Sequence, residues 1–169
     1  MSFIEKFLGK RVEIPEDRRY DPKQGLWAKS ARKEIVVGLT EPALVLAGGL
    51  TGLDWLVTEG QSVVKEQAVA FAITGKILYL NTPFAGTISI NFKAKENPSI
   101  VSKEPYSLGW LFRLETDGDT DHLLQSLVDD QAYMESLKGT EGFKNPDGLK
   151  GGVSGICKAV YSGIREQKI

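Results

Sequence analysis

The stretch Ala70–Ile90, AFAITGKILYLNTPFAGTISI, decides the fold of this chain. The apolar run Val69–Ile73 and the returning run Ile77–Asn81 predict two neighbouring strands. Between them, Gly75 and Lys76 predict a two-residue loop in which Gly75 takes the positive φ of a type II′ turn. The stretch therefore predicts an antiparallel β-hairpin.

Lys76 would stand by itself at the tip of this hairpin. The next lysines in either direction are Lys65 and Lys93, which lie well away from the tip. A flexible amine on a rigid turn suits the attachment of a covalent swinging arm. A solvated turn lysine is the plainer interpretation, because Gly-Lys turns are common.

Working outward, other short apolar runs alternate with glycine and proline turns. The break at Pro83-Phe84-Ala85-Gly86 precedes one such run. The predicted strands are Leu26–Lys29, Glu34–Leu39, Leu50–Val57, Thr87–Asn91 and Gly109–Leu114. Many short strands of this kind predict a mostly β domain with short helices, built as a small barrel or sandwich.

Helices are predicted at three places. Ser2–Leu8 has the spacing of a short amphipathic helix, and Thr40 precedes Glu41–Leu46 as an N-cap. A longer helix is predicted from Asp119 or Thr120 to about Leu137. Val12–Gln24, which is charged and contains two prolines, is predicted to be an extended linker, and the glycine-rich residues 139–155 to be a loop.

The composition excludes several classes of function. The chain has 169 residues, a net charge of −1, one cysteine and one histidine. The balanced charge disfavours nucleic-acid binding, and the single Cys157 and His122 disfavour a disulfide, a cysteine zinc cluster or a histidine-based triad. His122 is interpreted as a surface residue and Cys157 as a packed or idle thiol, with a redox or partner-binding role as the alternative. We expect no membrane span, no signal peptide and a cytoplasmic location.

The acidic residues before the predicted C-terminal helix do not form a calcium loop. Asp117, Asp119 and Asp121 alternate, but the glycine and the twelfth-position glutamate of an EF-hand do not follow them. We interpret these acids as the start of a helix, where they favour the helix dipole.

The order of the motifs resembles the H-protein family of the glycine cleavage system. The motifs that carry the resemblance are Trp27, Val37-Gly38-Leu39-Thr40-Glu41, Pro83-Phe84-Ala85-Gly86, Asn97-Pro98, Glu104-Pro105-Tyr106, Gly109-Trp110-Leu111-Phe112 and Ala132-Tyr133. The resemblance covers about residues 26–137. It implies a barrel-sandwich hybrid of two small antiparallel sheets, with residues 1–24 as an N-terminal extension, 25–138 as the lipoyl domain with its C-terminal helix, and 139–169 as an atypical tail.

The resemblance also implies a site. Lys76 is the candidate for covalent lipoate attachment, flanked by Gly75, Thr74 and Ile73. The family commonly has an acid three residues before the modified lysine, where this chain has Ile73. If this chain is aligned with the family without a gap before Pro83, Gly75 falls on the modified position. If the return strand is one residue shorter than in the family, Lys76 falls there.

Two functions follow from these observations. As a carrier with no catalysis of its own, the chain would bear an aminomethyl or sulfur-containing group on a lipoyl-lysine arm. Its partners would be glycine decarboxylase, aminomethyltransferase and dihydrolipoamide dehydrogenase-type proteins or other lipoate-dependent enzymes, with a lipoate ligase or transferase for loading. The alternative is a non-lipoylated binding or scaffold module, which the apolar residues Ile73, Ile77, Leu78 and Tyr79 near the tip would favour.

Overall fold

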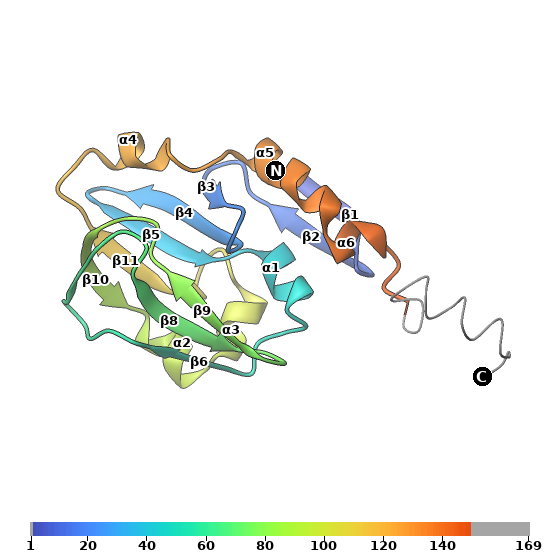
Figure 1. Cartoon of the computed structure of the whole chain (residues 1–169), viewed down its shortest axis with the longest axis horizontal. Coiled ribbons are helices and arrows are strands. Elements are labelled where there is room, and N and C mark those ends of the chain that lie inside the picture. Colours follow the sequence, from blue (N-terminus) through green and yellow to red (C-terminus); the bar gives the residue numbers. More distant parts are fainter. Residues whose placement is uncertain (1, 150–169) are drawn as a thin grey trace, which may run out of the picture.

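The computed structural model describes residues 2–149, which fold around two antiparallel sheets that face each other (Figure 1). The larger sheet has six strands in the order β3-β4-β5-β11-β10-β7, and the smaller has the order β6-β8-β9. The strands of the larger sheet are β3 (Arg19–Asp21), β4 (Leu26–Ala31), β5 (Glu34–Leu39), β7 (Ser62–Val63), β10 (Gly86–Ile90) and β11 (Phe112–Glu115). The smaller sheet consists of β6 (Gly52–Trp55), β8 (Ala68–Ile73) and β9 (Ile77–Asn81). The predicted mostly β sandwich is confirmed.

The main core lies between these two sheets. Alternate residues of each strand point inward, so Val37, Ile88 and Leu114 of the larger sheet are fully buried and share one apolar cluster with Ala70 and Leu80 of the smaller sheet. Burial of this kind is the main favourable contribution to folding. It gives the β8–β9 hairpin a rigid base.

Short helices connect the strands. They are α1 (Glu41–Leu46), α2 (Phe92–Glu96), α3 (Ser99–Lys103), α4 (Thr120–Leu124), α5 (Asp130–Ser136), α6 (Glu141–Lys144) and the 3-10 turn η1 (Leu137–Gly139). The predicted start of α1 is confirmed, because the Thr40 hydroxyl accepts a hydrogen bond from the Ala43 N–H at 3.1 Å. No helix within residues 2–149 is long and apolar enough to cross a bilayer.

The predicted N-terminal helix is wrong, since this segment forms a hairpin of β1 (Ser2–Phe7) and β2 (Lys10–Ile14). Leu8 and Gly9 form its turn, both with positive φ, which a two-residue hairpin loop favours. The strand register shifts between Ile4 and Phe7, and both side chains are buried. This irregularity lets two residues three positions apart face one side, which imitates helical spacing.

The predicted linker over Val12–Gln24 is also wrong at two places, where strands form. Its first residues complete β2, and Arg19–Asp21 form β3 at the edge of the larger sheet. The tyrosine of β3, Tyr20, is fully buried and stacks on Tyr133 with ring centroids 4.8 Å apart. The segment is therefore part of the packed fold.

The long C-terminal helix is predicted wrongly as one element. The helical chain breaks between α4 and α5, where Val128 forms an isolated β-bridge with Tyr20 and exchanges two backbone hydrogen bonds with it, at 2.8 and 2.9 Å. Asp129 then starts α5 by accepting a hydrogen bond from the Ala132 N–H at 2.8 Å. An apolar face continues through both helices, so periodicity alone did not show the break.

The loop predicted for residues 139–155 contains α6 within its described part. This helix packs on the N-terminal hairpin, and Figure 1 shows α5 and α6 beside β1 and β2. Phe7 meets Phe143 edge-to-face at 5.9 Å, and the Leu8 N–H donates to the Gly142 carbonyl at 3.1 Å. The two ends of the described chain thus form one small unit.

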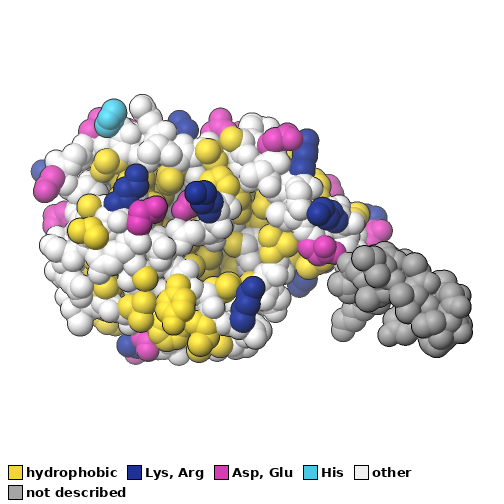
Figure 2. All heavy atoms as spheres, viewed as in Figure 1, with side chains coloured by type: hydrophobic (Ala, Val, Ile, Leu, Met, Phe, Trp, Pro, Cys, Tyr) yellow, Lys and Arg dark blue, Asp and Glu magenta, His cyan; other side chains and the backbone are white. Residues whose placement is uncertain are grey.

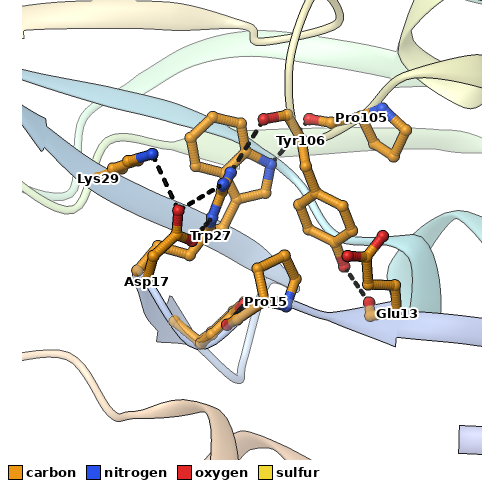
Figure 3. A network of polar contacts seen from close by, with 9 residues as sticks. Glu13, Pro15, Asp17, Trp27, Lys29, Pro105 and Tyr106 are labelled. Carbon is orange, nitrogen blue, oxygen red and sulfur yellow. Dashed lines mark hydrogen bonds and ion pairs between the residues drawn. The ribbon is translucent and has the colours of Figure 1, made fainter. Parts of the chain in front are cut away.

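A polar network joins the N-terminal segment to the sandwich (Figure 3). The Trp27 indole N–H donates to the Pro105 carbonyl at 2.9 Å, and the Tyr106 hydroxyl donates to the Glu13 carbonyl at 2.6 Å. The guanidinium of Arg18 lies 4.6 Å from the Trp27 ring and 2.8 Å from Asp17. The hydrogen bond from Arg18, with help from Lys29, lowers the pKa of Asp17 to about 2. Trp27 and Tyr106, which carried the family resemblance, therefore have structural roles.

Candidate functional site

The loop Thr74–Lys76 closes the β8–β9 hairpin, because Ile73 pairs with Ile77. The Thr74 N–H donates to the Lys76 carbonyl at 2.8 Å. The Thr74 hydroxyl accepts from the Lys76 N–H at 3.3 Å and lies 3.2 Å from the Lys76 carbonyl, to which it can donate. The backbone of Lys76 is thereby fixed while its side chain is exposed. The predicted position of Lys76 at the hairpin tip is confirmed.

The predicted type II′ turn is wrong. The loop has three residues, and Gly75 is not among the glycines with positive φ. Hydrogen bonds between Thr74 and Lys76 shape the loop instead. The loop therefore needs no glycine with a left-handed backbone conformation. A Cβ atom added to Gly75 would meet no atom within 4 Å.

We therefore expect Gly75→Ala to leave the free energy of unfolding unchanged or to raise it by up to about 1 kcal/mol, because alanine narrows the unfolded ensemble at a compatible position. Gly60→Ala is the matched control: its site is equally open, but its φ is +83°. That substitution should cost about 1–2 kcal/mol. Urea denaturation of both variants measures the difference. An equal loss in both would show that Gly75 needs a left-handed conformation.

The tip around Lys76 is apolar. Ile73, Ile77 and Tyr79 are 39%, 56% and 63% exposed, so these apolar side chains face solvent. Figure 2 shows an apolar surface over the small sheet. Ile73 offers no carboxylate beside the lysine, and the tip is therefore a cationic point on an apolar surface.

Beside the tip lies a cleft of about 470 Å³. One wall comes from the hairpin, including Lys76 and Leu80, and the others come from α1, the turn Pro22–Gly25 and the end of α5 with η1. Its lining is mainly aliphatic. The Tyr133 hydroxyl at its edge bonds the Thr40 hydroxyl at 2.6 Å, and burial raises the pKa of Tyr133 to about 12, so this phenol stays neutral. The sequence alone did not reveal the cleft, because its walls come from segments that lie far apart in the chain.

The other candidate residues do not assemble a second site. His122 is exposed, as predicted, and Asp119 caps α4 by accepting the Asp121 N–H at 3.1 Å. Within residues 2–149 no three side chains of histidine, cysteine, aspartate or glutamate are placed to hold a metal ion. Cys157 lies outside the described residues.

Comparison with known proteins identifies the family. The family model described as glycine cleavage H-protein matches residues 18–140. The chain belongs to the glycine cleavage H-protein family. The glycine cleavage system H protein of Thermus thermophilus is 34% identical over 131 residues, which cover 75% of this chain and 98% of that protein. Glycine cleavage system H protein 5 of Aquifex aeolicus is 33% identical, over 75% of this chain and 88% of its own length.

A solved structure supports the fold. The crystal structure of an H protein from Mycobacterium marinum matches with a TM-score of 0.61 and 24% identity, over 72% of this chain and 97% of that one. The barrel-sandwich fold class predicted from the sequence is confirmed. The N-terminal hairpin, the residues that follow it up to Asp17, and helix α6 all lie outside the segment that the family model matches.

Membership of the family confirms the predicted class of function. H proteins are lipoyl carriers of the glycine cleavage system, so this chain is a carrier component and not an enzyme. H proteins bear their lipoate covalently. The alternative of a non-lipoylated scaffold module gains no support from these comparisons.

Proposed function

We propose that Lys76 carries lipoate in an amide bond and that the chain presents this arm to partner enzymes. The observation that supports this most is the placement of Lys76, an exposed amine whose backbone is fixed at the apex of a hairpin. Acylation removes the charge of the amine and extends the side chain into a long arm that ends in two sulfur atoms.

The hairpin register favours Lys76 over the position that an alignment without a gap would select. That position is Gly75, which has no side chain to modify. Lys65 lines a different cleft, next to Phe84 and His122. Within the loop Thr74–Lys76, Lys76 supplies the only side-chain amine.

The fold and the cleft would do the work of a carrier without catalysing a reaction. The rigid hairpin holds the arm at a fixed origin, so the arm meets a docked active site at high effective concentration. The aliphatic cleft beside Lys76 offers its apolar chain a resting place between visits. Thr74, Gly75 and Ile73 would border the attachment point.

The partners follow from the family. We propose glycine decarboxylase, aminomethyltransferase and dihydrolipoamide dehydrogenase-type proteins as partners, with an aminomethyl group as cargo and a sulfur-containing group as the alternative. A lipoate ligase or transferase would load Lys76. Because Ile73 replaces the usual acid, that enzyme would meet an apolar tip.

We propose the cytoplasm as the location, residues 25–138 as the lipoyl domain, 1–24 as an N-terminal extension and 139–169 as an atypical tail.

The mass of the intact protein tests the attachment. The full chain is produced with lipoate and an active lipoate ligase or lipoyl transferase, alongside Lys76→Arg and the control Lys65→Arg. We expect a gain of one lipoyl group in the unchanged chain and in Lys65→Arg, and no gain in Lys76→Arg. An unmodified chain, when the same enzyme modifies an ordinary H protein, would refute the proposal.

A further inference from the structure

A second cleft, of about 430 Å³, lies between the N-terminal hairpin, α1 and α3, and we call it the hairpin–α1 groove. Its floor is aliphatic, because Val12 and Leu44 are buried there and Val45 is half-buried. Helix α1 packs against β2 and α6 at this place (Figure 1). Gly48 and Gly49 line one edge, where an added Cβ would meet no atom within 4 Å. The groove is therefore apolar at its floor and open at its edge.

The described chain ends beside this groove. Leu8, in the turn of the N-terminal hairpin, lines the groove, and Gly148 packs so closely on it that a Cβ at Gly148 would lie 2.6 Å from the Leu8 carbonyl oxygen. The Asn145 side chain accepts a hydrogen bond from the Leu149 N–H at 3.1 Å and donates one to the Leu149 carbonyl at 3.2 Å. The point from which residues 150–169 continue is therefore fixed next to the groove.

The residues that follow Leu149 have an apolar pattern in their sequence. Apolar side chains recur at spacings of three and four residues, at Val153, Ile156, Cys157, Val160, Tyr161 and Ile164. This spacing is typical of an amphipathic helix with one apolar side. Because such a helix is stabilised mainly by packing of that side, the segment 153–164 needs an apolar surface to cover. The groove offers one where the segment begins.

The groove and the segment are also complementary in charge. The α1 wall of the groove has the carboxylate of Glu41, and the hairpin wall has the amine of Lys10. In a helix, Lys158 and Arg165 would flank the apolar side on one edge, and Glu166 would flank it on the other. One of the two directions in which the helix can lie brings each edge against a wall of opposite charge.

We propose that the segment 153–164 docks in the hairpin–α1 groove of its own chain as an amphipathic helix. The link over residues 150–152 separates Leu149 from Val153 by at most about 14 Å. The segment therefore meets the groove at high effective concentration. The hairpin wall and the point where the segment begins both lie outside residues 18–140, the part that the family model matches. The docking is independent of lipoate on Lys76.

Contacts between methyl groups, measured as nuclear Overhauser effects in the full unlipoylated chain, test the docking. We expect contacts from the methyl groups of Ile156, Val160 and Ile164 to those of Leu44 and Val45. Such contacts arise only between groups that lie side by side, so tethering alone does not produce them. A mixture of two differently labelled preparations separates contacts within one chain from contacts between chains, and we expect the former alone.

A matched pair of substitutions tests the apolar side of the segment. Val160→Asp should lower the docked fraction about tenfold or more, because an unpaired carboxylate against aliphatic surface is costly. The contacts of Ile156 and Ile164 with the groove should then be lost. The control Ala159→Asp adds the same charge one residue away, off the apolar side, and should keep these contacts.

A second pair tests the groove. Ser102 is exposed and lines the groove, so Ser102→Tyr should fill it and weaken the contacts of the segment. Ser99→Tyr, on an exposed residue of the same helix α3 but outside the lining, should leave them unchanged.

Four results would overturn the inference. They are the absence of contacts with Leu44 and Val45, contacts of the segment with another surface instead, contacts only between chains, and an equal loss in Val160→Asp and Ala159→Asp. Since the experiment uses the unmodified Lys76, each of these results leaves the proposed function standing.

Discussion

Gly109→Ala is expected to lower the free energy of unfolding by about 3 kcal/mol, because there is no space for a methyl group. A Cβ atom at Gly109 would lie 2.6 Å from the Ile100 carbonyl oxygen, 2.7 Å from the Glu104 carbonyl oxygen and 2.7 Å from the Val101 Cα. All three atoms belong to the backbone of α3 and its C-terminal end, so no side chain can rotate away. The Gly109 N–H also donates to the Glu104 carbonyl at 2.8 Å, and this bond would have to lengthen.

Urea denaturation at neutral pH measures the effect, with Gly139→Ala as the control. Gly139 has no positive φ, and an added Cβ would meet nothing within 4 Å. Its substitution should change the free energy of unfolding by less than about 1 kcal/mol. If Gly109→Ala is no more destabilising than Gly139→Ala, the close packing of α3 on Gly109 is incorrect.

Phe7→Ala is expected to cost about 3–5 kcal/mol, the usual range for a buried phenylalanine. Phe7 is 0% exposed and packs edge-to-face on Phe143 of α6. Gly142 lies against the same ring, so closely that a Cβ there would overlap it. Loss of the ring would leave a cavity in the contact between the N-terminal hairpin and α6. The N-terminal hairpin and α6 lie outside the segment that the family model matches. The measurement also shows whether they unfold together with the sandwich.

Phe3→Ala is the matched control, in the same strand and with the same atoms removed. Phe3 is 39% exposed and packs under the guanidinium of Arg11 at 3.9 Å. Its loss should cost about 1 kcal/mol. Denaturation followed separately by far-ultraviolet circular dichroism and by tryptophan fluorescence gives the free energy of unfolding and shows whether the chain unfolds in one transition. A Phe7→Ala chain as stable as Phe3→Ala would contradict the packing of α6 on the hairpin.

Local patterns were sufficient wherever a residue's neighbours in the sequence decide its conformation. The apolar run Ile77–Asn81 and the cap at Thr40 predicted a strand and a helix start that the structure contains. The motifs around Trp27, Tyr106 and Gly109 led to the family, and the structure shows why these residue types are present. The Trp27 indole and the Tyr106 hydroxyl donate hydrogen bonds to specific backbone carbonyls, and the Gly109 backbone packs directly against α3.

The N-terminal segment shows where local patterns mislead. The spacing of Ile4 and Phe7 fits both a helix and a strand with an irregular register, and only pairing with Lys10–Ile14 and packing on α6 select the strand. In the same way, the apolar face that continues from Leu124 does not reveal the break between α4 and α5. The backbone hydrogen bonds between Val128 and Tyr20 set that break. In both cases a partner more than 100 residues away in the sequence, α6 or Tyr20, contributes to the choice.

The sequence by itself determined that a lone lysine stands on a hairpin of a small β sandwich, and which family has that arrangement. Those features depend on short-range alternation, turn residues and motifs, which are all local. Only the tertiary structure decided the loop of three residues held by Thr74, the exposure of Ile77 and Tyr79, and the cleft beside Lys76. The physical reason is that a cavity and its charge belong to several segments at once, and only their packing brings those segments together.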